Sequence, residues 1–549
     1  MKSSLPRLHA VGLGLALLFA FAVNATAQSQ PDESPAPSTG AITGQVVTDT
    51  GQPVAGATVI VRAYGPTGQN RVATTDTEGN FQVSGLDQGS YTVVAQVSAF
   101  VTPPRDPDNT QPSFHRVGDT VKLQLVKGGV ITGSVTSSAD EGIVGVKVRA
   151  YMIRDSAGRA TRYGINPREK TTDDRGIYRI YGLPAGTYVV SAGGGGSFSG
   201  FNINPYDLDA PTYSPSSTRD TATEVSVSPG AEASNIDIHY RGEPGHAVSG
   251  MAVSPVGAGP STFTIYLSPI SNGVSQWSHS TFQPPGNQGF SFYGVADGDY
   301  DVVAQTYFPG GEFALSTPRR LKVNGADITG LELTATPLAS ISGRVALEES
   351  KAPECQGKRR PLFAETLITP WHNEKAAAKD QPQLPWSLGT PTFPDKQGEF
   401  VMRNLASGQY RFNTRPLVKY WYLQSISWRS AATPPRGTPA IKPVDAARNW
   451  ISLKSGERAS GLTITLAAGA ASLKGKIKLA EGEKLPPRLF VSLVPAEPEK
   501  AEDVLRYFVA LVDADGGFAL NNLPPGRYFT IAKPAADNES NLLSKLRLP

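Results

Sequence analysis

The stretch that decides the fold is residues 75–91, TDTEGNFQVSGLDQGSY, in which Phe81 and Tyr91 lie ten residues apart. The same spacing between two aromatic residues occurs five times along the chain. The pairs are Phe81/Tyr91, Tyr178/Tyr188, Phe290/Tyr300, Phe400/Tyr410 and Phe518/Tyr528. In every pair, an apolar residue lies five positions before the second aromatic residue and a glycine lies two positions before it. Such self-similarity indicates a tandem array of one unit of roughly 100 residues.

The first unit predicts β-strands and tight turns. Residues 41–47 and 58–63 alternate and are rich in β-branched side chains, as expected of half-buried strands. Two further strands begin near Phe81 and Tyr91, each after a glycine-containing turn. We therefore predict an all-β protein: a tandem array of five antiparallel β-sandwich domains of the immunoglobulin or prealbumin type, preceded by a signal peptide.

An aspartate recurs fifteen residues before the second aromatic residue in four units: Asp76, Asp173, Asp395 and Asp513. A calcium ligand and a turn-capping side chain are the two interpretations. Calcium takes 6–8 oxygen ligands, and a single carboxylate per unit does not supply them. The sequence therefore favours aspartates that accept backbone hydrogen bonds within the turn.

These motifs carry a family resemblance. The pattern G-x-V-x-D-x-x-G-x-P-V-x-G-A-x-V, followed by T-D-x-x-G-x-F and L-x-x-G-x-Y, resembles the carboxypeptidase regulatory-like domain. Units one and two match well, and units three to five match mainly in their closing halves. The family is similar to the Cna-B and transthyretin-like sandwiches and has a carbohydrate-binding-like fold. The resemblance implies no peptidase activity, because in those enzymes this domain accompanies a separate catalytic domain.

The predicted domain organisation covers the whole chain. Lys2 and Arg7, an apolar run at 11–23 and Ala25-Thr26-Ala27 indicate a signal peptide cleaved before Gln28. The predicted ranges are 1–27 signal peptide, 28–40 linker, 41–126 sandwich one, 127–241 sandwich two, 242–336 sandwich three, 337–467 sandwich four and 468–549 sandwich five. We expect sandwich five to be incomplete, since 21 residues follow Tyr528. The short linkers predict a semi-rigid rod.

Composition narrows the function classes. The net charge of +3 gives no electrostatic footprint for nucleic acid. Cys355 is the single cysteine, so we expect no internal disulfide framework. We predict an exported protein, periplasmic, cell-surface or extracellular, with no membrane span in the mature chain.

The sequence contains no catalytic motif in the structural context that its chemistry requires. The histidines lack the H-E-x-x-H spacing of a zinc protease. The near match to G-x-S-x-G at 195–200 lies in a glycine-rich loop without the strand and helix of a nucleophile elbow. We predict a protein that is not an enzyme and needs no cofactor or metal.

Aromatic side chains in two regions are candidate ligand contacts. The insertion at 193–223 contributes Phe201, Tyr206 and Tyr213, since loops are where binding concentrates. In YWYLQSISW (420–428), alternation predicts that Tyr420, Tyr422 and Trp428 face the core, which leaves Trp421 outward. For the aromatic residues of this strand, the sequence favours packing in the core over ligand contact.

We therefore predict a non-enzymatic, exported, multi-domain binding or structural protein of the cell envelope, with protein or glycan partners. Two alternatives stay open: a dedicated carbohydrate-binding protein, and an accessory part of a larger surface protein truncated at its C-terminus. The ligand, the oligomeric state and the role of Cys355 are undetermined at this level.

Overall fold

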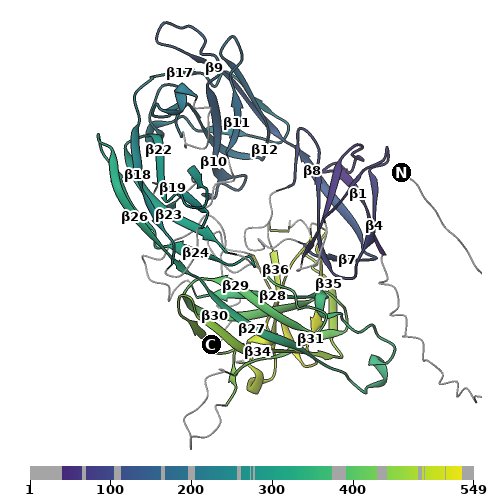
Figure 1. Ribbon diagram of the computed structural model, residues 1–549. Coiled ribbons are helices and arrows are strands. Elements are labelled where there is room, and N and C mark those ends of the chain that lie inside the picture. Colours follow the sequence, from purple (N-terminus) through teal and green to yellow (C-terminus); the bar gives the residue numbers. More distant parts are fainter. Residues whose placement is uncertain are drawn as a thin grey trace, which may run out of the picture. The chain divides into compact units, whose positions relative to one another are not determined.

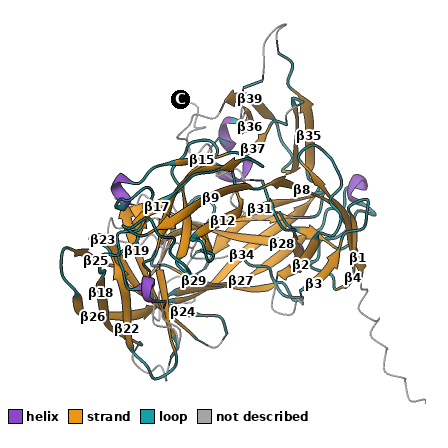
Figure 2. Cartoon of the chain, turned by 90° about the horizontal axis from the view of Figure 1, so that it is seen from above, coloured by secondary structure: helices purple, strands orange, loops and turns teal. Residues whose placement is uncertain are grey.

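The computed structural model describes most of the chain beyond residue 39. The described residues are 40–64, 70–103, 113–161, 167–195, 204–255, 261–271, 274–275, 279–308, 310–373, 391–429, 442–479, 485–486, 489–501, 503–513 and 515–534. They form β-strands and six short 3₁₀ helices, with no α-helix among them (Figure 1, Figure 2). The predicted all-β fold class is thereby confirmed. Within this part of the chain, no helix has the length and apolar character that crossing a membrane requires. The predicted signal peptide, residues 1–27, lies outside the described residues.

The strands of each sheet come from one predicted range, to within one residue, so unit one to unit five are kept as names for these ranges. Unit one has two four-stranded sheets, ordered β4-β1-β8-β6 and β3-β2-β5-β7. Its strands are β1 (Gly40–Thr48), β2 (Thr58–Tyr64), β3 (Arg71–Thr74), β4 (Asn80–Leu86), β5 (Ser90–Gln96), β6 (Phe100–Val101), β7 (His115–Arg116) and β8 (Thr120–Lys127). Alternation along β4 buries Phe81 and Val83. Gly85, with a left-handed φ of 71°, then shifts the alternation so that Leu86 is buried as well.

Unit two has a five-stranded sheet, β11-β10-β13-β14 with β15 beside β13, and a four-stranded sheet, β12-β9-β16 with β17 beside β9. Its elements are β9 (Gly129–Thr136), β10 (Lys147–Asp155), β11 (Arg168–Thr171), β12 (Ile177–Leu183), β13 (Gly186–Ala192), η1 (Pro205–Asp207), β14 (Thr212–Tyr213), η2 (Arg219–Thr221), β15 (Val225–Val227), β16 (Glu232–Ala233) and β17 (Ile238–His239).

Unit three forms a single nine-stranded sheet, β20-β19-β23-β24-β26-β18-β22, with β21 beside β19 and β25 beside β23. Its strands are β18 (His246–Val253), β19 (Phe263–Ser271), β20 (Val274–Ser275), β21 (His279–Gln283), β22 (Gly289–Val295), β23 (Gly298–Tyr307), β24 (Phe313–Ser316), β25 (Arg319–Val323) and β26 (Ile328–Pro337). The two halves are continuous because β24 pairs with both β23 and β26.

Unit four has a five-stranded sheet, β29-β27-β34-β31-β32, and a three-stranded sheet, β28-β30-β33. Its elements are β27 (Ala339–Glu348), η3 (Pro353–Cys355), η4 (Phe363–Glu365), β28 (Thr366–His372), β29 (Glu399–Leu405), β30 (Gly408–Pro416), β31 (Trp421–Trp428), β32 (Val444–Asp445), β33 (Ile451–Leu453) and β34 (Arg458–Ala468).

Unit five has the two-stranded sheet β35-β38 and the three-stranded sheet β37-β36-β39. Its elements are β35 (Ala471–Lys476), β36 (Leu489–Pro495), η5 (Pro498–Lys500), η6 (Val504–Arg506), β37 (Phe508–Leu511), β38 (Gly517–Leu523) and β39 (Tyr528–Pro534).

The first strand of each unit carries a glycine directly opposite the first aromatic residue of the repeat. The pairs are Gly44/Phe81, Gly133/Tyr178, Gly250/Phe290, Gly343/Phe400 and Gly475/Phe518. In unit one, a Cβ atom on Gly44 would lie 2.6 Å from Cζ of Phe81. The missing side chain therefore lets the aromatic ring pack across the strand.

The second aromatic residue of each pair is a tyrosine that fastens the preceding turn. Its hydroxyl donates to the carbonyl oxygen four residues earlier. The bonds are Tyr91 to Asp87 (2.7 Å), Tyr188 to Pro184 (2.6 Å), Tyr300 to Ala296 (2.9 Å), Tyr410 to Ala406 (2.9 Å) and Tyr528 to Pro524 (2.9 Å). One hydrogen bond thus explains why the repeat keeps a tyrosine at this place.

Three of the four recurring aspartates cap turns, as predicted, whereas in unit five Oδ1 of Asp515 accepts from the N–H of Gly517. Oδ1 of Asp76 accepts hydrogen bonds from the backbone N–H groups of Glu78 (3.0 Å) and Asn80 (2.7 Å). Asp173 and Asp395 make the same pair of bonds. The backbone N–H groups of Ile177 and Arg175 lower the pKa of Asp173, because they stabilise the ionised carboxylate.

Units one to four add one feature to the predicted antiparallel sandwich. Their first strand also pairs in parallel with the strand that closes the unit: β1 with β8, β9 with β17, β18 with β26 and β27 with β34. Parallel neighbours require a long crossover, and the whole body of each unit lies between these two strands in the sequence.

Candidate functional site

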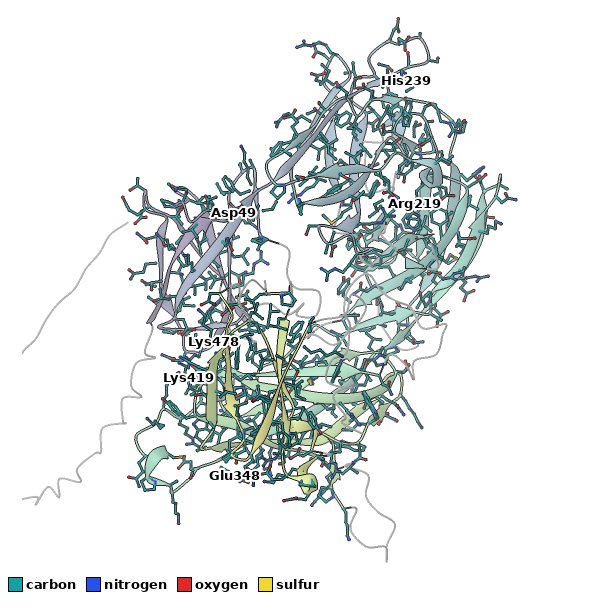
Figure 3. All side chains as sticks on the ribbon, turned by 180° about the vertical axis from the view of Figure 1, so that it is seen from behind. Asp49, Arg219, His239, Glu348, Lys419 and Lys478 are labelled. Carbon is teal, nitrogen blue, oxygen red and sulfur yellow. The ribbon has the colours of Figure 1, made fainter. Side chains whose placement is uncertain are left out.

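A cavity of about 370 Å³ lies between the insertion of unit two and unit three. One wall is formed by residues 210–220, and the other by the turn at 293–300 between β22 and β23. Its polar side chains include Tyr213, Arg219, Asp220, Arg241, Glu243, His246, His279, Asp297, Asp299 and Tyr300. Figure 3 labels Arg219 at this place in the molecule.

The insertion wall is held by hydrogen bonds to the body of unit two. Oδ1 of Asn204 caps η1 by accepting from the N–H of Tyr206 (3.1 Å), and its Nδ2 donates to Gly145 O (2.6 Å). Farther along, β14 pairs with β13 in the register Ser191↔Tyr213. This wall is consequently part of the sheet.

Two buried charged residues, Arg149 and Asp207, are paired where the insertion of unit two begins. Nε of Arg149 donates to Glu169 Oε2 at 2.6 Å, and its Nη1 donates to the carbonyls of Gly193 (3.1 Å) and Gly194 (2.7 Å). Asp207 bonds Lys147 Nζ at 2.7 Å and lies 3.9 Å from Arg149 Nη2. Buried charges are tolerated when they are paired in this way, so the cluster anchors the start of the insertion.

His279 meets the insertion from unit three. A Cβ atom on Gly195, whose φ is +74°, would lie 2.6 Å from its Cε1. Burial, and then the positive charge of Arg149, lower the pKa of His279 to about 4. The ring is therefore neutral at neutral pH and can both donate and accept a hydrogen bond.

Two tyrosines complete the walls. Burial raises the pKa of Tyr213 well above its ordinary value and raises that of Tyr300 to about 12. Both phenols stay protonated at neutral pH. Their rings are 5% and 8% exposed, so neither offers an open face on which a ligand could stack.

Of the three predicted contact residues of the insertion, the two that the structure describes have different positions relative to the cavity. Tyr213 lines the cavity. Tyr206 instead packs edge-on against Tyr240, with ring centroids 5.7 Å apart. Phe201 lies outside the described residues. Their role in ligand contact stays a prediction.

The predicted orientation of Trp421 is wrong. Trp421 is 4% exposed within the core of unit four, and its Nε1 donates to Arg359 O at 3.2 Å. Tyr420 is 47% exposed. A β-bulge between Leu423 and Ser425 shifts the alternation, so one phase cannot describe the whole strand. Trp428, beyond the bulge, does pack against the core, as predicted.

The sequence indicates the insertion of unit two as a candidate binding region, but it does not indicate the wall of the cavity that unit three forms. Arg219, His279 and Asp299 belong to no recognisable motif, and they meet only through tertiary packing. An unusually long connection after β13 was the single available signal.

The cavity offers hydrogen-bonding groups of both charges to a polar ligand. Arg241 is already engaged by Glu243, and His246 lies 3.4 Å from Asp297. Among the described residues, His, Cys, Asp and Glu side chains nowhere gather in threes that could hold a metal ion. The arrangement fits binding of a polar molecule.

Comparison with known proteins adds low-identity similarities. The TIE protein of Bacillus anthracis is 16% identical over 54% of this chain and 50% of its own, with a TM-score of 0.14, so this chain spans half of its length. The minor pilin GBS52 of Streptococcus agalactiae is 16% identical over 37% of this chain and 95% of its own, with a TM-score of 0.20. Two B repeat units of the collagen binding protein of Staphylococcus aureus are 13% identical over 78% of this chain and 100% of their own, with a TM-score of 0.13.

No curated protein matches the chain. The strand pairings described above define the fold, and these scores add nothing on function. Residues 41–111 match the carboxypeptidase regulatory-like domain, in agreement with the resemblance that their sequence motifs carry.

Proposed function

We propose that this protein is an exported, non-enzymatic, multi-domain protein of the cell envelope. In this proposal its β-sandwich units are fastened to one another and present their loops to protein or glycan partners. The observation that carries the proposal is a fastening point that recurs at the same position of the repeat.

The fastening point is the residue just before the apolar residue of the repeat. It has a left-handed φ in every unit: Gly85 (71°), Gly182 (70°), Gly294 (65°), Asn404 (61°) and Asn522 (62°). Glycine and asparagine are the residues that adopt this conformation most readily. In units four and five the asparagine side chain extends beyond its own unit.

Asn404 bonds the hairpin between β23 and β24 of unit three. Its Nδ2 donates to Gly311 O at 2.9 Å, and its Oδ1 accepts from the N–H of Phe313 at 3.0 Å. Nearby, Glu312 faces Arg458 of unit four at 3.2 Å.

Asn522 repeats this arrangement one unit later. Its Nδ2 donates to Val418 O and Trp421 O of unit four, both at 2.7 Å. At the equivalent place in unit three, a Cβ on Gly294 would lie 2.4 Å from Asp207 O of unit two. Three successive units therefore contact the preceding unit through the same turn.

The direct test replaces both asparagines by glycine. Asn404→Gly and Asn522→Gly keep the left-handed backbone but remove hydrogen bonds that contribute roughly 0.5–1.5 kcal/mol each. In small-angle X-ray scattering the double variant should show a larger maximum dimension and more flexibility than the parent. The matched control is Gly85→Asn, since no atom lies within 4 Å of a Cβ at that position. Unchanged scattering from the double variant would contradict fastening.

Export is tested separately in the native host. Cell fractionation should place the protein outside the cytoplasm, with Gln28 as the mature N-terminus. Recovery of an uncleaved cytoplasmic chain would contradict this part of the proposal.

A dedicated carbohydrate-binding protein is the second candidate function. The cavity beside Tyr213 favours it, because Arg219, Asp220 and Asp299 supply charged hydrogen-bonding groups of the kind that hydroxyl-rich ligands use. A glycan array probed with the parent chain and Arg219→Ala tests this candidate. The control is Asp49→Ala, which changes an exposed charge in unit one. Binding lost only with Arg219→Ala would favour the carbohydrate function.

A further inference from the structure

The first strand of unit five differs from its four counterparts in the number of neighbours. The first strands of units one to four each pair with an antiparallel strand on one side and a parallel closing strand on the other. Among the described residues, β35 pairs with β38 alone. The edge that carries the closing strand elsewhere is open in this part of unit five.

The glycine opposite the first aromatic residue of the repeat shows the same difference between unit five and the other units. A Cβ on Gly44, Gly250 or Gly343 would lie 2.0–2.2 Å from a carbonyl oxygen of the closing strand. The three atoms nearest to a Cβ on Gly475 all belong to the ring of Phe518. Among the described residues, no backbone carbonyl approaches Gly475 as closely as the closing strand approaches its counterparts.

The core behind this edge is incompletely covered. Phe81, Tyr178, Phe290 and Phe400 are 1–5% exposed in their units. Their counterpart Phe518 is only partly buried, as are Leu473 and Ile477. A further strand on β35 would remove apolar surface from water at this place.

The backbone of β35 is ready to pair. The N–H of Ile477 donates to Gly516 O on the β38 side, so the N–H groups of Lys474 and Lys476 point to the open edge. In unit one, Thr43 is the counterpart of Lys474, and its N–H donates to Asp119 O at the start of the closing segment.

Charge indicates what fits the edge. The side chains of Lys474 and Lys476 are exposed on β35, and Nζ of Lys476 lies 3.5 Å from Oδ2 of Asp515, which leaves Lys474 as the lysine of this strand without an ion pair among the described residues. In unit three, Met251 is the counterpart of Lys476, and the closing strand places Glu332 opposite it, between Leu331 and Leu333. An acidic residue between two aliphatic ones would thus match both the lysines and the core.

We propose that the open edge of β35 docks an extended segment of a separate polypeptide, added as a parallel strand with aliphatic side chains alternating with acidic ones. This inference rests on the proposed function and names its partner class as protein. Main-chain hydrogen bonds would supply the affinity, and the alternating side chains the specificity.

The probe is a synthetic peptide with the sequence of residues 328–336, ITGLELTAT, which closes unit three. A scrambled peptide of the same composition is its control. Bound to the full mature chain, the probe should slow amide hydrogen exchange at Lys474 and Lys476 by at least about tenfold. Exchange in β1 and β27 should not change.

Charge variants test specificity without altering buried residues. Lys474→Glu with Lys476→Glu should weaken peptide binding at least about tenfold, because like charges face each other across strands unfavourably. Lys478→Glu makes the same charge change just beyond the end of β35 and should bind like the parent (Figure 3).

Three results would overturn the proposal: no binding by the folded parent, equal binding of the scrambled peptide, or binding only after residues 535–549 are removed. The last would mean that the chain's own segment covers the edge. Scattering of the Asn404→Gly and Asn522→Gly variant reports fastening independently, so failure here leaves the proposed function standing.

Discussion

Units four and five share the repeat but differ in how much they bury. Both have the glycine–aromatic pair, the tyrosine bond and the fastening asparagine. Among the described residues, the core of unit four contains twenty buried residues and that of unit five contains four. Part of the difference lies in β34 and β31, which add Leu462, Ile464, Leu466 and Trp421 to unit four. The repeat motif thus specifies strand pairing, and the closing strands complete the core.

The largest expected effect comes from breaking the core of unit four. Trp421→Ala should lower the free energy of unfolding of unit four by about 3–5 kcal/mol, because it empties a buried site. Gln424→Ala, on the exposed bulge of the same strand, should cost under about 0.5 kcal/mol. Hydrogen exchange by mass spectrometry reports each unit separately. A small effect at Trp421 would contradict the assigned orientation.

A glycine substitution should sharpen the contrast between the two units. In unit four, the Cβ of Gly343→Val would lie 2.2 Å from Leu462 O, and the variant should lose about 1–3 kcal/mol. Gly475→Val in unit five meets a movable ring instead of a backbone carbonyl, so its loss should be less than half as large. Equal losses would mean that the open edge is filled in solution.

Removing one hydroxyl should have a smaller effect. Tyr410→Phe deletes the bond to Ala406 O and should cost about 1 kcal/mol, since the carbonyl is left without that donor. The less buried Tyr528→Phe should cost about half of that. Hydrogen exchange at increasing denaturant concentration gives the unfolding midpoint of each unit, and the shift of that midpoint measures the cost of each substitution. A larger cost in unit five would reverse the comparison.

The smallest effect near neutral pH is ionisation of the same tyrosines. Burial raises the pKa of Tyr410, and also that of Tyr528, above the unfolded value of about 10. The stability this contributes is fully present below pH 10 and is lost as the pH rises through the folded pKa. The free energy of unfolding of unit four, measured from pH 9 to pH 12, should fall as the pH rises. Tyr410→Phe should remove the part of this pH dependence that comes from Tyr410.

Much of the fold could be predicted because the repeat consists of residues that determine strands and turns through short-range interactions. The aspartate turns, the strand at Phe81 and the tyrosine at each turn follow from spacing alone. The parallel closing strands could not be predicted, because pairing across a whole unit leaves no local pattern. Alternation alone assigns Trp421 to the wrong face, because a bulge between Leu423 and Ser425 changes the phase of β31.

The candidate site was only half predictable. The insertion that carries Tyr213 shows as an irregularity in the repeat, whereas Arg219 and His279 become neighbours through tertiary packing. The fastening role of Asn404 and Asn522 was likewise hidden. Sequence indicates a residue that tolerates left-handed backbone, but not that its amide reaches another unit.

The most direct test of the account is the distance distribution across the joint between units four and five. Spin labels at Glu348→Cys and Lys478→Cys, both exposed positions (Figure 3), can be measured by pulsed electron resonance in a Cys355→Ser background. We expect one narrow distribution in the parent chain and a clearly broader one with Asn522→Gly. Broad distributions in both, or narrow ones in both, would contradict the claim that this asparagine fastens the units.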